Sequence, residues 1–261
     1  KKILIESSAY YLNNREIFQN FISTLFLPYK EEFEALDEST LNCDNRSQED
    51  FNLLIHQKLV RDYMNIYTPY RGLLLYHGLG SGKTCTSIAI AEGLKTDKEV
   101  IIMTPASLRA NYIEELKKCG DEIYKKKQYW EFIPSDTDKN IIPILSNILK
   151  ISKEFIQKNG GAWLVNVTKP SNFEALTAAE KGSLDAQLKE MIEYKYRFIN
   201  YNGMRLSHLR EITANYSTNP FSNKVIIIDE AHNFISRIVN KIQKPDTLPM
   251  RLYEYLMNAE N

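Results

Sequence analysis

The sequence has no net charge, few cysteines and no long hydrophobic run, and each absence excludes a class of protein. With 33 basic and 33 acidic side chains, no global electrostatic field draws the chain to nucleic acid. The three cysteines form no Cys-x-x-Cys pair, which argues against a zinc knuckle or a disulfide framework. No apolar stretch reaches the ~20 residues that span a membrane, and residues 1–6 lack a signal-peptide core. We therefore expect a soluble intracellular protein in a reducing compartment, with no membrane partner.

What the sequence does contain is the composition of a globular protein. Hydrophobic residues make up 43% and charged residues 25% of the 261 positions, enough for a sizeable core in one large or two small domains. The most basic stretch is Lys125–Lys127, with Lys117 and Lys118 just before it. Such a run forms either a local nucleic-acid surface or, more commonly, the solvated face of a helix. The sequence leaves both interpretations open.

The segment 78–84, Gly-Leu-Gly-Ser-Gly-Lys-Thr, has the composition of a phosphate-binding loop. It follows an apolar run at 73–76, which predicts a buried strand, and precedes a helical pattern over 83–94. Glycines let successive N–H groups turn toward a phosphate, while a lysine and a hydroxyl reach the terminal phosphates and Mg²⁺. His77 departs from the strict pattern, which has glycine there, and a glycine-rich turn can also arise by chance. The predicted nucleotide-binding residues are Gly78, Gly80, Ser81, Gly82, Lys83 and Thr84.

A second motif, later in the chain, supports the first. Val225–Ile228 predicts a strand buried on both faces, and it ends in Asp229–His232, with the sequence Asp-Glu-Ala-His. Magnesium needs a carboxylate ligand at the strand end, and hydrolysis needs a second carboxylate to orient or deprotonate water. An ordinary acidic helix start is the alternative. The predicted metal ligands are Thr84 and Asp229, and the predicted catalytic residues are Glu230 and Lys83.

These motifs resemble those of a known family. Gly80–Thr84 and Asp229–His232 are similar to motifs I and II of superfamily 2 DEAH-box and Swi/Snf-type helicases, and residues 100–108 are similar to motif Ia. His56–Gln57 resembles the adenine-reading glutamine motif of the Swi/Snf-type branch. Residues 69–78 are most similar to the helicases and early transcription factor ATPase subunits of large cytoplasmic DNA viruses. The resemblance covers residues 50–119 and 197–240.

The resemblance implies an α/β fold, a RecA-like P-loop domain with a parallel sheet and helices on both faces. Strands are expected near 73–76, 100–103, 197–201 and 225–228. We expect residues 1–50 to form an N-terminal helical extension with an acidic linker, and 51–261 to form the first RecA-like ATP-binding domain, with a family-specific insertion at about 121–196. The chain stops before a Ser-Ala-Thr-like motif III. We therefore expect a segment of a longer polypeptide that is inactive by itself.

Further site residues follow from the resemblance. The amide of Gln57, on a predicted helix, offers the donor and the acceptor that the edge of adenine requires, although an exposed helical glutamine is the alternative. Residues 104–107 form a predicted turn at a strand end, where hydroxyl and N–H groups can hold a nucleic-acid phosphate or simply cap a helix. A polar tip follows the strand at 197–201. The candidate nucleic-acid residues are Thr104, Pro105, Ser107, Asn200 and Asn202.

The function that the resemblance implies is ATP hydrolysis coupled to nucleic acid. The chain would be the ATP-binding domain of a helicase or translocase, with ATP and Mg²⁺ as cofactors. Its partners would be DNA or RNA, a second RecA-like domain of the same polypeptide and a viral RNA polymerase, in the host cytoplasm or the virion. The alternative is an ATP-gated transcription or packaging factor that changes its partner contacts without unwinding a duplex.

Overall fold

A computed structural model describes most of the chain, in two compact units that comprise Lys1–Asp97 and Lys98–Asn261. None of the described helices is long and apolar enough to cross a membrane. The predicted acidic linker, at 37–50, lies outside the described residues. The domain boundary near residue 50 and the insertion at 121–196 stay predictions. The described residues are 15–34, 53–64, 72–78, 80–96, 98–136 and 140–260.

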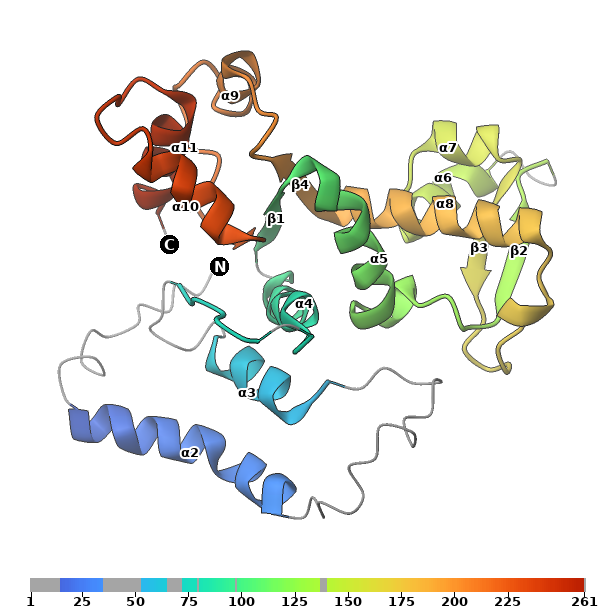
Figure 1. Cartoon of the computed structure of the whole chain (residues 1–261). Coiled ribbons are helices and arrows are strands. Elements are labelled where there is room, and N and C mark those ends of the chain that lie inside the picture. Colours follow the sequence, from blue (N-terminus) through green and yellow to red (C-terminus); the bar gives the residue numbers. More distant parts are fainter. Residues whose placement is uncertain are drawn as a thin grey trace. The chain divides into compact units, whose positions relative to one another are not determined.

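The described part of the first unit consists of helices and one extended segment. An ion pair of 2.7 Å between Lys58 and Glu32 joins α2 to α3, and the rings of Phe26 and Tyr63 stack at 6.4 Å between centroids. Helix α3 also packs against α4, so a side chain on α3 can reach the loop that precedes α4. The predicted N-terminal helix is present as α2. The helices are α2 (Arg15–Glu34), α3 (Ile55–Tyr63) and α4 (Lys83–Leu94) (Figure 1).

The apolar run before the glycine-rich loop does not form the predicted buried strand. Residues 72–78 have no regular secondary structure, and Leu74 and Tyr76 are 75% and 92% exposed. An apolar run becomes a strand only when another strand supplies its backbone hydrogen bonds, and none of the described residues pairs with 72–78 in a sheet. The prediction of a strand at 73–76 is therefore wrong for this structure. The helix predicted at 83–94 is confirmed as α4.

The second unit is built on a parallel three-stranded sheet with the order β4-β1-β5. Central β1 has Met103 opposite Ile199 of β4 and Ile228 of β5, so all three strands end at the same edge. Residues 100–103 are almost completely buried, whereas β5, at one side of the sheet, is half-buried along its length. The prediction that 225–228 is buried on both faces is thus wrong: β5 is an edge strand, with β1 as its one partner among the described strands, and its side chains stay partly exposed. The strands are β1 (Glu99–Thr104), β4 (Tyr196–Asn200) and β5 (Lys224–Ile228).

Helices follow each strand and complete the core around the sheet. The segment after β1 begins with a 3-10 helix, η3 (Ala106–Leu108), which leads into α5 (Arg109–Cys119). Helix α9 (Leu206–Ile212) follows β4, and α10 (Ala231–Val239) and α11 (Leu248–Met257) follow β5. The α/β fold predicted from the sequence, with a parallel sheet and helices, is confirmed. The buried core consists of Ile101, Met103, Ile199, Tyr201, Leu209, Phe221, Phe234, Ile238 and Leu252.

Residues 121–195 form a smaller module beside the sheet. Two antiparallel strands pair with Phe132 opposite Trp163, and the ring of Trp163 is buried against Phe132. Helix α8 begins with a capping box between Thr177 and Glu180. Figure 1 shows α6 and α7 gathered with the strands along the first part of α8, which leads directly into β4. The elements are η4 (Glu122–Tyr124), β2 (Trp130–Pro134), α6 (Ile141–Leu149), α7 (Lys153–Lys158), β3 (Gly161–Val165), η5 (Phe173–Ala175) and α8 (Ala178–Lys195).

Candidate nucleotide-binding site

The glycine-rich loop turns into α4 through a left-handed glycine. Gly82 is the N-cap of α4, with φ 75° and ψ 36°, and Gly80 also has φ 75°. A Cβ atom built on Gly82 would lie 2.4 Å from Nε2 of Gln57. Any other residue at Gly82 would therefore carry the steric cost of a left-handed backbone and would require the end of the Gln57 side chain to shift. The space beside the backbone of Gly82 is filled by the side-chain amide of Gln57, which donates to the carbonyl of Gly82.

Polar side chains of the loop are held by the loop's own carbonyl groups. Nζ of Lys83 donates to the carbonyl oxygens of His77, at 3.2 Å, and Gly78, at 3.0 Å. The hydroxyl of Ser81 donates to the carbonyl of Gly78 at 2.9 Å. Thr84 is half-buried in the first turn of α4, whose first N–H groups have no partner within the helix. An ammonium group and helical N–H groups at one turn form a site of the kind that binds phosphate.

Two adjacent side chains of α3 contact this loop. The amide of Gln57 is buried; its Nε2 donates to the carbonyl of Gly82 at 3.2 Å, and its Oε1 accepts from the N–H of Leu54 at 2.9 Å. Each of these two amide atoms can make a further hydrogen bond, so the contacts leave capacity for an adenine edge. Nε2 of His56 lies 3.0 Å from the carbonyl of Ser81. No role of its own was predicted for His56, although its place beside Gln57 in the resembling motif was a usable signal.

The Asp-Glu motif forms a turn at the end of β5. The N–H of Asp229 donates to the carbonyl of Met103 at 2.9 Å, which continues the pairing of β5 with β1. Glu230 is the N-cap of α10 and has a left-handed backbone, with φ 50° and ψ 48°. Its side chain is exposed, and Oε2 lies 3.3 Å from Nδ1 of His232. The turn therefore presents a carboxylate outward at the edge where the three strands end.

Tyr201 lies beneath this turn and was not predicted to take part in it. Its hydroxyl donates to the carbonyl oxygens of Asp229, at 3.0 Å, and Glu230, at 3.1 Å. The ring is buried against Phe234, at 5.5 Å between centroids. Burial, followed by the charges of Asp229 and Glu230, raises the pKa of Tyr201 to about 12, so the hydroxyl remains a donor near neutral pH. A hydroxyl-bearing residue directly after β4, a strand of the same parallel sheet as β5, was the available signal.

The candidate nucleic-acid residues do not share one environment. Thr104 and Asn200 are opposite each other at the ends of β1 and β4. Thr104 is fully buried and its hydroxyl donates to the carbonyl of Pro105, which is also buried, so neither faces solvent. Asn200 is half-buried, and its Oδ1 has no hydrogen-bond partner among the described residues. Ser107 and Asn202 are exposed, and only these two present a freely accessible side chain.

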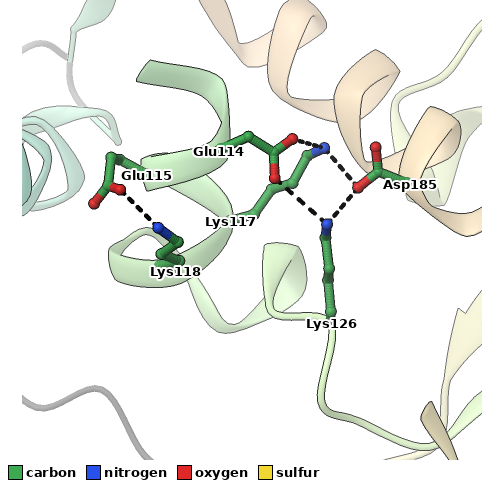
Figure 2. Close-up of polar contacts among 6 residues, drawn as sticks. All are labelled: Glu114, Glu115, Lys117, Lys118, Lys126 and Asp185. Carbon is green, nitrogen blue, oxygen red and sulfur yellow. Dashed lines mark hydrogen bonds and ion pairs between the residues drawn. The ribbon is translucent and has the colours of Figure 1, made fainter. Parts of the chain in front are cut away.

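The basic stretch is engaged in ion pairs rather than free for a polyanion (Figure 2). Nζ of the buried Lys117 lies 2.7 Å from Glu114 and 2.8 Å from Asp185, and Lys126 lies 2.6 Å from Asp185. These contacts join α5, the segment after η4 and α8. The hydrogen bonds from Lys117 and Lys126 outweigh the opposing effect of burial and lower the pKa of the Asp185 carboxyl. The cluster therefore favours the structural interpretation of this basic stretch.

The candidate residues at the ends of β1, β4 and β5 lie together at one edge of the sheet in the second unit. The glycine-rich loop and Gln57 belong to the first unit. Within each unit, the predicted residues are close in space: Gln57 with Gly82, and Asp229 with Glu230 above Tyr201. Within the first unit, the cradle at Gly82 and the ammonium of Lys83 are groups of the kind that bind phosphate. Within the second, Asp229 offers a carboxylate, the kind of group that Mg²⁺ prefers. The roles assigned to these residues stay predictions.

Comparison with known proteins places the chain among viral relatives. Two candidate ATP-dependent RNA helicases of Acanthamoeba polyphaga mimivirus are similar, one with 37% identity over 41% of this chain and 19% of its own length, the other with 27% identity over 89% and 20%. A Termination factor NPH-I homolog of African swine fever virus is 24% identical over 92% of this chain and 26% of its own length. The chain thus spans about a fifth of the length of the first two relatives. No solved structure shows significant similarity.

Residues 51–253 match the family described as Type III restriction enzyme, res subunit. The match includes the glycine-rich loop, Gln57 and the Asp-Glu turn, and it covers most of the chain. It agrees with the helicase resemblance of these motifs and with the viral relatives. The chain therefore belongs to the helicase family described as Type III restriction enzyme, res subunit, and is related to helicases and NPH-I termination factors of large DNA viruses.

Proposed function

We propose that the chain is the ATP-binding domain of a nucleic-acid-dependent ATPase, a helicase or translocase that hydrolyses ATP with Mg²⁺. The observation that carries the proposal is the cradle at Gly82. A left-handed glycine, with the end of the Gln57 side chain against the position of its missing Cβ atom, begins α4 directly before Lys83. This combination provides backbone N–H groups and a positive charge at one turn, as a triphosphate requires.

Each residue has a distinct task in the proposed reaction. Lys83 would exchange its contacts with the carbonyls of His77 and Gly78 for the terminal phosphates. Thr84 and Asp229 would hold Mg²⁺, which neutralises charge on the phosphates when bound. Glu230 would orient or deprotonate the attacking water, since its carboxylate is exposed at the turn. This scheme requires the loop and the turn to face one nucleotide, which we propose by analogy with the family.

Adenine and nucleic acid would be recognised by other parts of the chain. Gln57 would contact the adenine edge with the remaining hydrogen-bonding capacity of its amide. Ser107 and Asn202 are exposed and fit contacts with nucleic-acid phosphates, and Nη1 of Arg237 lies 3.4 Å from the carbonyl of Asn202. A second RecA-like domain of the same polypeptide is a further proposed partner.

A second function is favoured by the similarity to the Termination factor NPH-I homolog, which extends over 92% of this chain. In this alternative, the domain belongs to a transcription or packaging factor that uses ATP to change its contacts with a viral RNA polymerase and does not unwind a duplex. The same loop and turn would bind the nucleotide in both cases. The two functions differ in what the bound nucleotide drives.

ATPase and strand-displacement assays on the full-length protein would test these functions. We expect ATP turnover to rise when single-stranded DNA or RNA is added, and labelled duplexes to be separated when ATP is present. Nucleotide binding without turnover or displacement would support the alternative. Failure to bind ATP at any concentration of Mg²⁺ would contradict both. Single-stranded and duplex forms of DNA and RNA should be compared at one fixed salt concentration, because binding to phosphates depends strongly on salt.

A further inference from the structure

Tyr201 is placed to control the geometry of the Asp229–Glu230 turn. It is the first residue after β4, and its buried hydroxyl reaches the carbonyl oxygens of both residues of the turn. Its ring packs on Phe234, which lies one turn into α10. One side chain of the β4 segment thus contacts both the backbone of the turn and the helix that the turn begins.

The turn needs such support because its backbone is unfavourable. Glu230 adopts a left-handed conformation, which crowds the Cβ atom of any residue other than glycine. Strained conformations of this kind persist only where the surrounding structure holds them. The N–H of Asp229 is held by Met103, and both carbonyls of the turn are held by Tyr201. A phenylalanine would keep the ring packing but leave both carbonyls without this donor.

The same segment also contacts α10 from its exposed side. Asn202 follows Tyr201 directly, and its carbonyl accepts a hydrogen bond from Arg237, two turns along α10 from Glu230. Asn202 and Arg237 are both exposed, so a phosphate group can reach them. We call Asn202, at the end of the β4 segment, the Asn202 tip. A ligand bound there would contact the residue next in sequence to Tyr201, whose hydroxyl holds the turn.

We propose that Tyr201 is a positioning residue that fixes the direction of the Glu230 carboxylate and transmits a change at the Asn202 tip to the turn. The inference rests on the proposed ATPase function, because it concerns the regulation of the same site. Tyr201 itself touches neither phosphate nor water in this scheme. Its effect should therefore be on turnover rather than on the affinity for ATP.

The test compares Tyr201→Phe with wild type in the full-length protein, with Tyr253→Phe as the matched control. Tyr253 is an exposed tyrosine of α11, so its substitution removes a hydroxyl without disturbing the turn. Turnover is expressed per ATP-binding site, titrated with a fluorescent ATP analogue, so that loss of folded protein does not count as loss of kcat. Hydrogen exchange at residues 228–234 reports on the turn independently of catalysis.

We expect Tyr201→Phe to lower kcat about tenfold, to leave KM for ATP within about twofold, and to reduce the protection of residues 228–234. The ATPase rate of Tyr201→Phe in the presence of single-stranded nucleic acid should fall together with its kcat. Tyr253→Phe should have the rates and the exchange of wild type. Faster exchange with an unchanged kcat would show a purely structural role and overturn the proposal, as would an equal loss in the control. If wild type itself hydrolyses no ATP, the proposed function fails even where the exchange result shows that the contact exists.

Discussion

The glycine-rich loop and the Asp-Glu turn begin their helices with the same backbone conformation but different residues. Gly82, the N-cap of α4, has φ 75° and ψ 36°, and Glu230, the N-cap of α10, has φ 50° and ψ 48°. Glycine adopts this conformation without steric cost, whereas glutamate pays roughly 1–2 kcal/mol. Gly82 has Gln57 against the position of its missing side chain, and Glu230 has Tyr201 beneath its carbonyl.

The difference shows what each site needs from its residue. A loop that surrounds a phosphate binds it with backbone N–H groups, so glycine, which has no side chain, suits it best. A turn that activates water must present a carboxylate, so glycine is excluded there and other contacts have to compensate for the strain. We infer that the backbone of the loop is set mainly by its glycines, while the turn depends on Tyr201, which follows β4 at the same edge of the sheet. The predictions below test this contrast, beginning with the largest expected effect.

Lys83→Ala should abolish ATP hydrolysis, by about 10³-fold or more, and weaken ATP binding in the full-length protein. The substitution removes the positive charge that the loop holds between the carbonyls of His77 and Gly78. Steady-state ATPase and equilibrium nucleotide binding measure the two effects. Lys118→Ala, an exposed lysine paired with Glu115, is the control and should be silent. Full activity in Lys83→Ala would contradict the phosphate-loop interpretation.

Glu230→Gln should retain ATP binding but lower turnover by about 10²–10⁴-fold, because the amide keeps the shape of the side chain and loses its basicity. The measurement is the ratio of kcat to that of wild type, beside the dissociation constant for ATP. This variant breaks the function of the turn without touching the loop. If Glu230→Gln binds ATP no better than Lys83→Ala, the separate tasks assigned to the two residues are wrong.

Separate substitutions of the two N-cap residues, Gly82 and Glu230, should change the free energy of unfolding in opposite directions. Gly82→Ala should lower the free energy of unfolding by about 1–3 kcal/mol, because its Cβ atom collides with Gln57 in a left-handed backbone. Glu230→Gly should raise it by about 0.5–1 kcal/mol, since glycine relieves the strain. Glu230→Gly should nevertheless be inactive. Urea unfolding of the full-length protein measures both changes, and a destabilised Glu230→Gly would show that the turn is not strained.

A small effect, similar in size to that of Glu230→Gly, is expected in the ion-pair cluster of Figure 2, whose residues lie outside both sites in the sequence. Asp185→Asn should lower the free energy of unfolding by about 1 kcal/mol at pH 7, because the carboxylate is 39% exposed and partly screened. The folded-state pKa of Asp185 lies below its usual value. Its contribution is therefore complete above about pH 4, the unfolded value, and is lost as the pH falls through the lower folded value.

Urea unfolding of wild type and Asp185→Asn at pH 7 and at pH 3 would check this dependence. The difference between the two proteins should shrink at the lower pH, where the wild-type carboxyl begins to bind a proton. Lys118→Gln, which breaks an exposed pair with Glu115, should change stability by less than about 0.5 kcal/mol at either pH. A difference for Asp185→Asn that is constant with pH would assign the effect to packing and not to charge.

Much of the architecture could be predicted from local patterns in the sequence. The apolar runs at 100–103 and 225–228, in which every residue except Met103 is β-branched, are strands because β-branched side chains suit the pleated surface of a sheet. Gly82 could be placed at the start of a helix because glycine alone accepts a left-handed backbone cheaply. The helix from Lys83 to Leu94 followed from its apolar spacing. In each case, the information lies within a few residues of the chain.

Tertiary structure decided whatever depends on a partner distant in sequence. The apolar run at 73–76 has the pattern of a strand but lacks a described strand to pair with. Among the described strands, β5 pairs with β1 at the edge of the sheet, and its side chains are half-buried. Thr104 has the hydroxyl of a phosphate ligand, yet it is fully buried. Tyr201 meets the Asp-Glu turn only because parallel strands bring their carboxyl ends to one edge. Local spacing specifies backbone preference, whereas pairing and burial arise from contacts that no local pattern contains.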